Sequence, residues 1–173
     1  MQRRSKCSSA LSRATSWFVV VLALAAHSPA LAQERRNYFH DPFTQVTSGL
    51  ADCPVPEEPL VTPDEMRADA HSRSERGTRC YMSGRCRLPN SYLYDKEIVP
   101  RVKQYILQDA RFGDTSVWVL GQRRWVFLKG CVRNEAQSVQ LEKLAREVDD
   151  VEAVVNELMV GVRGKPKYRT TAP

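Results

Sequence analysis

Cysteine is the residue type whose spacing says most about the chemistry of this 173-residue chain. The five cysteines are Cys7, Cys53, Cys80, Cys86 and Cys131. Once Cys7 is set aside with the N-terminal segment considered below, four remain, and an even number suits two disulfide bonds in an exported protein. Four cysteines allow three pairings, and the sequence does not choose among them.

A zinc site is the alternative use of these thiols. Cys53, Cys80 and Cys86 could bind the metal together with His71. The spacing of Cys80 and Cys86, however, is longer than the short Cys-x2–4-Cys spacing that structural zinc prefers. Disulfides are therefore favoured over a metal.

Signals of catalysis are sparse in the rest of the sequence. After residue 32 the histidines are His40 and His71, and neither lies in a motif that could pair it with a nucleophile. The chain has no Gly-x-Ser-x-Gly, glycine-rich phosphate loop, His-Glu-x-x-His or Cys-x-x-Cys motif. The adjacent Asp149 and Asp150 suit a solvated turn. We therefore predict a binding protein rather than an enzyme, with no cofactor, metal or small-molecule substrate.

Residues 1–32 have the layout of a secretory signal peptide. The segment has four basic and no acidic residues, an apolar run from Trp17 to Ala26, and the small-x-small pattern Ala30-Leu31-Ala32 of a cleavage site. An uncleaved membrane anchor is the alternative, but a helix needs about 20 apolar residues to span a bilayer. We expect cleavage before Gln33 and a location in the periplasm, an oxidising compartment in which disulfides form.

The formal charge of +6 is concentrated at the two ends of the chain. Residues 33–161 contain 18 basic and 20 acidic side chains, so a basic surface for nucleic acid is not expected. Residues 162–173 are predicted to form a disordered basic tail, which either keeps the protein soluble or contacts anionic phospholipid headgroups. The cations of this tail are Arg163, Lys165, Lys167 and Arg169.

Residues 33–94, here called the extension, are predicted to be mostly loop. They contain six of the ten prolines and show little apolar periodicity. A helix near 63–76 is the exception, since Thr62 and Glu65 form a capping box around Pro63, and Gly77 is expected to end the helix. A segment so poor in apolar residues needs the disulfides or the rest of the chain to hold it in place.

Residues 95–161 show the periodicities of a small α+β domain. Apolar residues at helical spacing predict one helix that Asp95 could cap and that ends before Gly113, and another capped by Asn134. Residues 116–120 and 124–131 predict a hairpin with its turn at 121–123, and residues 151–160 predict a last strand. This αββαβ order predicts a two-layer sandwich of a three-stranded sheet and two helices.

The second and third predicted strands carry motifs that resemble the BON domain, a module of osmotically induced periplasmic proteins and other bacterial envelope proteins. The motifs are Val126-Phe127-Leu128-Lys129-Gly130-Cys131-Val132 and the spaced residues Val151, Val154, Asn156, Leu158 and Val160. Arg123-Arg124 and Asp150 stand where the family usually has glycine, so the turn geometry is expected to differ there. The resemblance implies a non-enzymatic envelope module associated with phospholipid surfaces.

Strand alternation divides the predicted sheet into an inner and an outer face. With Val126 and Leu128 facing inward, large apolar side chains line the outer face. The candidate contact residues there are Trp118, Trp125, Phe127 and Met159, with Leu120, Val155 and Cys131 beside them.

Two interpretations of this outer face compete. In the first, the extension covers it and is held by a disulfide to Cys131. In the second, the face binds a lipid or an envelope protein, for instance in a secretion or surface assembly of which this chain is an accessory subunit. The sequence also allows a dimer through an edge of the sheet.

Overall fold

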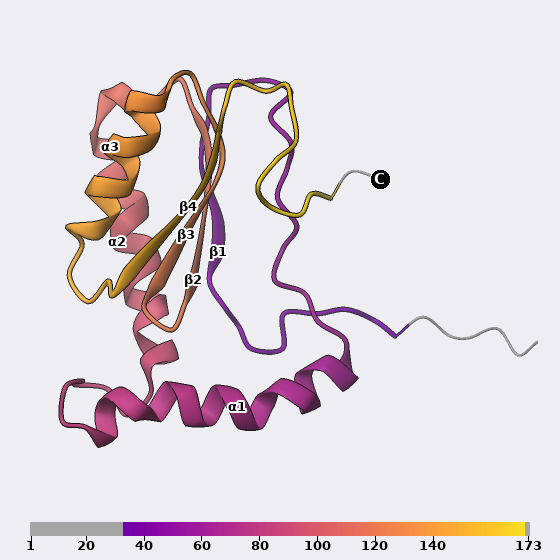
Figure 1. Ribbon diagram of the computed structural model, residues 1–173, viewed down its shortest axis with the longest axis vertical. Helices are drawn as coiled ribbons and strands as arrows, with labels where there is room; N and C mark the ends of the chain where they lie inside the picture. Colours follow the sequence, from indigo (N-terminus) through magenta and orange to yellow (C-terminus); the bar gives the residue numbers. More distant parts are fainter. Residues whose placement is uncertain (1–32, 172–173) are drawn as a thin grey trace, which may run out of the picture. The chain divides into compact units, whose positions relative to one another are not determined.

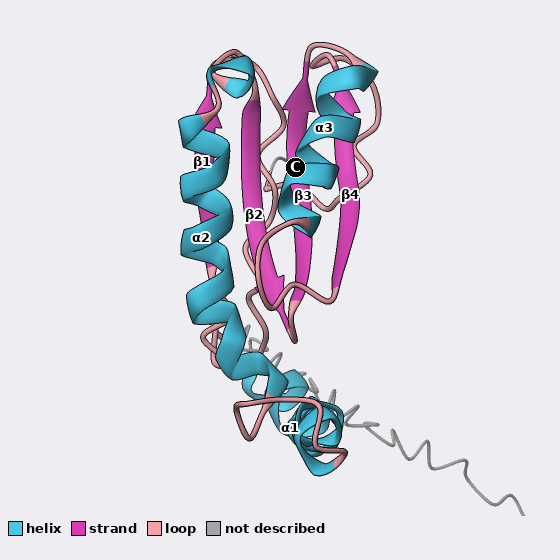
Figure 2. Cartoon of the chain, turned by 90° about the vertical axis from the view of Figure 1, so that its left-hand side faces the viewer, coloured by secondary structure: helices cyan, strands magenta, loops and turns pink. Residues whose placement is uncertain are grey.

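Four strands form one sheet in the computed structural model, which describes residues 33–171 (Figure 1). The strands lie in the order β1 (Phe43–Ser48), β2 (Ser116–Gln122), β3 (Trp125–Val132) and β4 (Ala153–Val160). β1, β2 and β3 are antiparallel neighbours, whereas β3 and β4 run parallel (Figure 2). The predicted signal peptide, residues 1–32, lies outside the described residues.

Two helices, α2 (Asp95–Gln108) and α3 (Glu135–Arg146), cover one face of this sheet (Figure 2). α3 supplies the crossover that the parallel pair β3 and β4 requires. Its start is confirmed, because Asn134 Oδ1 accepts the amide of Gln137 at 3.0 Å. The fully buried side chains of the main core include Ile98, Val102, Ile106, Val117, Val126, Leu128, Leu141 and Leu158. The predicted αββαβ order of this part is confirmed.

The sheet has one strand more than the sequence predicted. β1 belongs to the extension and pairs with the edge of β2 that faces away from β3, with a register shift between Gln45 and Thr47. Thr47 Oγ1 accepts the amide of Val117 at 3.0 Å and lies 2.9 Å from Thr115 Oγ1. The prediction of a three-stranded sheet is wrong because this otherwise unpaired edge of β2 recruits the extension.

A third helix, α1 (Pro63–Met82), extends beyond the predicted range of 63–76. Its start is confirmed by the capping box between Thr62 and Glu65. The predicted stop at Gly77 is wrong, since this glycine serves close packing. A β-carbon there would lie only 2.3 Å from Asn90 Oδ1, so the helix passes through Gly77 against the Asn90 side chain.

The β2–β3 hairpin turns at Arg123 and Arg124 rather than at the predicted 121–123. Both residues have positive φ, 57° and 67°, a conformation that glycine or asparagine usually supplies in two-residue hairpins. The carboxylate of Asp95 accepts the amides of both, at 2.6 Å and 2.7 Å. Asp95 therefore holds the turn instead of capping α2. Gly121 lies within β2, where a β-carbon would come within 2.6 Å of Val99.

The burial of Asp95 makes the stability of the fold depend on pH. Burial raises the pKa of Asp95 to about 7, although hydrogen bonds from the two turn amides oppose the shift. Between about pH 4 and pH 7 the folded protein therefore binds more protons at this site than the unfolded chain. The free energy of unfolding should fall by on the order of 2–4 kcal/mol as the pH rises through this window. Urea unfolding at a series of pH values should show a flatter profile for Asp95→Asn.

Asp109 provides the control for this measurement. Hydrogen bonds from Arg111 lower the pKa of Asp109. Its contribution to stability is therefore lost only as the pH falls through its lowered folded pKa. Asp109→Asn should leave the slope between pH 4 and pH 7 unchanged. A slope that survives intact in Asp95→Asn would show that another group takes up the proton.

Side chains hydrogen-bond to backbone groups of both edge strands. In β4, Asn156 Oδ1 accepts the amide of Leu158 at 3.1 Å, and Arg146 Nη2 donates to the carbonyl of Val154 at 3.4 Å. In β1, the side-chain amide of Gln45 donates to the carbonyl of Thr47 at 3.1 Å. These contacts leave fewer backbone groups for another chain to pair with, so they disfavour a dimer through a sheet edge.

Candidate binding site on the outer face of the sheet

The outer face of the sheet carries a second buried apolar cluster. Trp118, Cys131 and Met159 pack there with Cys53 of the extension. Trp118 and Met159 are only 6% and 8% exposed, so they cannot serve as an open contact surface. Of the four candidate contact residues, only Trp125 and Phe127 are half-buried and keep part of their surface accessible.

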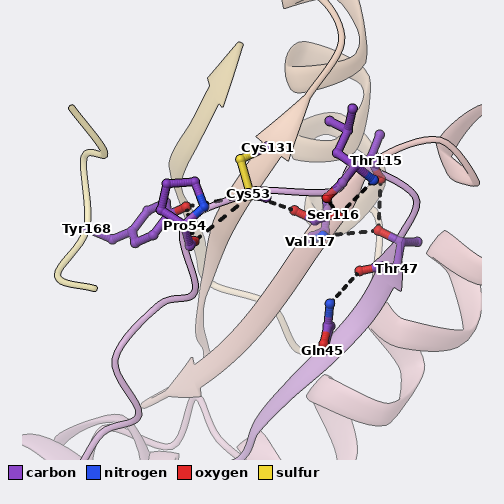
Figure 3. Close-up of a disulfide and its surroundings, with 10 residues drawn as sticks. Gln45, Thr47, Cys53, Pro54, Thr115, Ser116, Val117, Cys131 and Tyr168 are labelled. Atoms are coloured by element: carbon purple, nitrogen blue, oxygen red, sulfur yellow. Dashed lines mark hydrogen bonds between the residues drawn. A yellow bond between two sulfur atoms is a disulfide. The ribbon is translucent and has the colours of Figure 1, made fainter. Parts of the chain in front are cut away.

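A disulfide bond between Cys53 and Cys131 fastens the extension to β3 (Figure 3). Beside it, Ser116 Oγ accepts the amide of Leu50 at 3.0 Å and donates to the carbonyl of Leu50 at 2.8 Å. The extension therefore lies across part of the outer face, held by one covalent bond and by side-chain contacts to β2.

The second disulfide bond joins Cys80 at the end of α1 to Cys86. The predicted pair of disulfides is confirmed and its connectivity is determined. The zinc alternative is wrong, because both sulfurs of each pair are bonded to one another. Arg124 Nη1 donates to the sulfur of Cys86 at 3.2 Å, so the small disulfide loop lies against the hairpin turn. No group of three His, Cys, Asp or Glu side chains that could hold a metal occurs in residues 33–171.

The C-terminal segment is ordered through residue 171, in contrast to the disordered tail that the sequence predicted. The amide of Glu57 donates to the carbonyl of Arg169 at 2.8 Å, and the amide of Thr171 donates to the carbonyl of Val55 at 3.0 Å. Tyr168 is 8% exposed, and its hydroxyl donates to the carbonyl of Pro54 at 2.8 Å (Figure 3). The tail's cations remain exposed: Arg163, Lys165, Lys167 and Arg169.

Burial also fixes the protonation of this tyrosine. It raises the pKa of Tyr168 to about 12, and the negative charge of Glu157 adds to the shift. The phenol therefore keeps its proton at neutral pH and remains a hydrogen-bond donor to Pro54. Tyr168 and the two backbone hydrogen bonds thus attach the cation-rich tail to the extension.

A groove of about 490 Å³ remains open between the outer face, the extension and the tail. Apolar side chains such as Phe39, Leu60 and Leu120 line it together with charges of both signs. The lining cations are Arg35, Arg73, Lys129, Lys167 and Arg169, and the lining acids are Asp41, Glu57, Glu58, Glu65, Asp69 and Glu157. A neighbouring hollow shares Gln122 with the groove and is lined by Trp125 and Phe127. The two candidate contact residues that stay accessible therefore lie beside this groove.

A buried ion pair between Asp41 and Arg73 joins the start of the extension to α1. The two guanidinium nitrogens lie 2.5 Å and 3.1 Å from the carboxylate oxygens, and the side chains of Arg73 and Asp41 are 12% and 5% exposed. Gln122 donates to the same carboxylate at 2.6 Å. The guanidinium also lies 4.0 Å from the ring centre of Phe39 and 3.8 Å from that of Tyr92. No sequence motif predicts this contact, because its members are far apart along the chain.

The domain that carries these surfaces corresponds to a known family. The family model of the BON domain matches residues 94–161, which include α2, β2, β3, α3 and β4. Residues 94–161 form a BON domain. The resemblance carried by the strand motifs is thereby confirmed. BON domains are non-catalytic modules of the periplasm and cell envelope, and as a family they are associated with phospholipid binding.

None of the curated proteins matches the chain. Across residues 33–171, no helix combines the length and the apolar character needed to cross a membrane. β1, α1, Cys53 and the tail lie outside the residues matched to the BON domain. The groove is therefore lined both by the matched domain and by segments outside it.

Proposed function

We propose that this chain is a non-enzymatic binding protein of the bacterial periplasm, exported by a cleaved signal peptide, and that it attaches to anionic phospholipid surfaces. The observation that carries the proposal is the ordered tail beside the BON domain. It exposes four cations on a segment that buries only one large side chain, Tyr168. The family's association with phospholipids supports the same function.

The strength of this attachment to phospholipid follows from the charge of the tail. Each basic residue close to an anionic surface contributes about 1 kcal/mol, and salt screens the attraction. Because the backbone of the tail is already paired with residues 55–57, less conformational entropy is lost on binding than for a free segment. We expect reversible and salt-sensitive attachment.

The tail lysines provide the test of this function. Lys165→Gln combined with Lys167→Gln should weaken binding to phosphatidylglycerol vesicles by about tenfold or more, because two of the four cations are lost. Co-sedimentation at low and high salt measures the effect. The wild-type protein should lose most of its vesicle binding at high salt and should bind phosphatidylcholine vesicles poorly.

A matched control removes the same charge from the helical side of the protein. Lys96 and Lys103 both belong to α2. The double variant Lys96→Gln/Lys103→Gln should bind vesicles nearly as well as the wild type. Equal binding by the tail variant and the wild type would rule out the tail as the contact.

An accessory role in a larger envelope assembly is the second candidate function. It is favoured by Trp125 and Phe127, which remain partly accessible beside the groove. The indole N–H of Trp125 is buried and finds no acceptor within residues 33–171. Aromatic side chains at the edge of a groove are typical contacts of protein partners. Parallel capture on vesicles and from an envelope extract distinguishes the two functions.

A further inference from the structure

A small pocket at the C-terminal end of α1 is unusually rich in arginine. It has a volume of about 230 Å³ and lies between α1, the Cys80–Cys86 loop and the tip of the β2–β3 hairpin. Its charged lining residues are Arg76, Arg79, Arg85, Arg123 and Glu152. The lining thus contains four arginines and one glutamate, a balance quite different from the mixed charges of the groove.

Most of these arginines are not neutralised by the protein itself. Arg76 pairs with Asp69 at 2.8 Å. Within residues 33–171, no carboxylate forms an ion pair with Arg79, Arg85 or Arg123. Like charges held close together destabilise a fold unless a counterion offsets their repulsion. The pocket therefore has the electrostatic character of an anion site.

The backbone holds these side chains in place from three separate segments. Arg76 and Arg79 are three residues apart on α1 and so lie on neighbouring positions of one helix face. Arg85 lies within the Cys80–Cys86 loop, and its Nε donates to Ser83 Oγ at 2.9 Å. Arg123 lies at the hairpin tip, where Asp95 accepts its backbone amide at 2.6 Å. The disulfide and Asp95 thus limit the ordering that a ligand must impose.

We propose that this pocket binds a phosphate group. Guanidinium groups match the geometry of phosphate oxygens through paired N–H donors, and several arginines can surround one phosphate. The volume is below the range of about 300–1,000 Å³ typical of drug-sized ligands, so it suits a single phosphate or a small phosphate ester. The phosphate can belong to a soluble molecule or to a headgroup at a lipid surface. The site is separate from the tail, and three of its arginines lie outside the BON domain.

The test uses the oxidised protein and inorganic phosphate as the probe. Isothermal titration at low ionic strength should detect phosphate binding to the wild type. Arg79→Gln combined with Arg123→Gln should weaken it by about tenfold or more, because charge-assisted hydrogen bonds are lost. The double variant Lys96→Gln/Lys103→Gln removes the same charge from α2 and should bind inorganic phosphate as the wild type does. Thermal unfolding checks that both variants remain folded.

A second arm of the experiment distinguishes the source of the phosphate. Vesicles that contain phosphatidic acid present a phosphate monoester at a surface, whereas glycerol 3-phosphate presents it in solution. A loss in Arg79→Gln/Arg123→Gln for either probe supports the site and names its source. Unchanged binding of all three probes by this variant, or no binding of any of them by the wild type, would overturn the proposal. A failure of the tail variants to affect vesicle binding would leave this result untouched.

Discussion

Replacement of Cys53 and Cys131 together by alanine should lower the free energy of unfolding by about 4 kcal/mol. The two cysteines are separated by 78 residues, and a bond that closes so long a loop strongly restricts the unfolded chain. The same bond holds the extension over Trp118 and Met159, so its loss should also expose these side chains. Urea unfolding followed by tryptophan fluorescence measures both effects.

Replacement of Cys80 and Cys86 by alanine is the matched control. This bond spans a separation of only six residues, so its removal should cost about 2 kcal/mol. It should also leave Trp118 and Met159 covered, because the bond from Cys53 to Cys131 still holds the extension over them. If loss of the short loop were as costly as loss of the long one, the bond from Cys53 to Cys131 would not be the main restraint on the extension.

Arg73→Ala should destabilise the protein by about 3–5 kcal/mol, which is the typical cost of leaving a buried charge without its partner. The variant strands the carboxylate of Asp41 at 5% exposure and removes the contacts of the guanidinium with Phe39 and Tyr92. Arg73→Lys should recover only part of the loss, since an ammonium group cannot reproduce a bidentate and stacked contact. Chemical denaturation measures the free energy for each variant.

Arg67 is the control on the same helix. It pairs with Asp64, but both side chains are more than 60% exposed. Exposed ion pairs contribute about 0–1 kcal/mol, so Arg67→Ala should have little effect. Similar losses in Arg67→Ala and Arg73→Ala would mean that the contact with Asp41 is no stronger than an ordinary surface pair.

Residues 95–161 could be predicted from the sequence because each element buries one face. Leu141 and Ala145 repeat at the spacing of a helix, and Val126 and Leu128 alternate as a half-buried strand requires. The predicted position of the hairpin turn is wrong. Arg123 and Arg124 adopt positive φ with the help of Asp95, which comes from a distant part of the chain.

The extension was predicted less well because its order depends on distant partners. β1 does contain the β-branched Thr44, Val46 and Thr47, but a run of six residues does not define a strand until the edge of β2 is known. Asp41 and Arg73 are charged residues 32 positions apart, and nothing local predicts that they become buried together.

The candidate site was predicted in part. Strand parity correctly placed Trp118 and Cys131 on the outer face, whereas the cover over that face was one of two interpretations that the sequence left open. The order of the tail was missed because its cations, Gly164 and Pro166 are typical of a flexible segment. Its stability comes instead from Tyr168 and from backbone pairing with the extension.

The two disulfide bonds are nested, since Cys80 and Cys86 both lie between Cys53 and Cys131 in the chain. A chain that enters an oxidising compartment from its N-terminus presents Cys53, Cys80 and Cys86 before Cys131 arrives. During that interval, Cys53 can pair only with Cys80 or Cys86, and either disulfide would be non-native. Cys80 and Cys86 meet more often than either meets Cys53, because the loop between them is much shorter. Their early pairing removes both wrong partners, so the order of the cysteines along the chain itself favours correct oxidation.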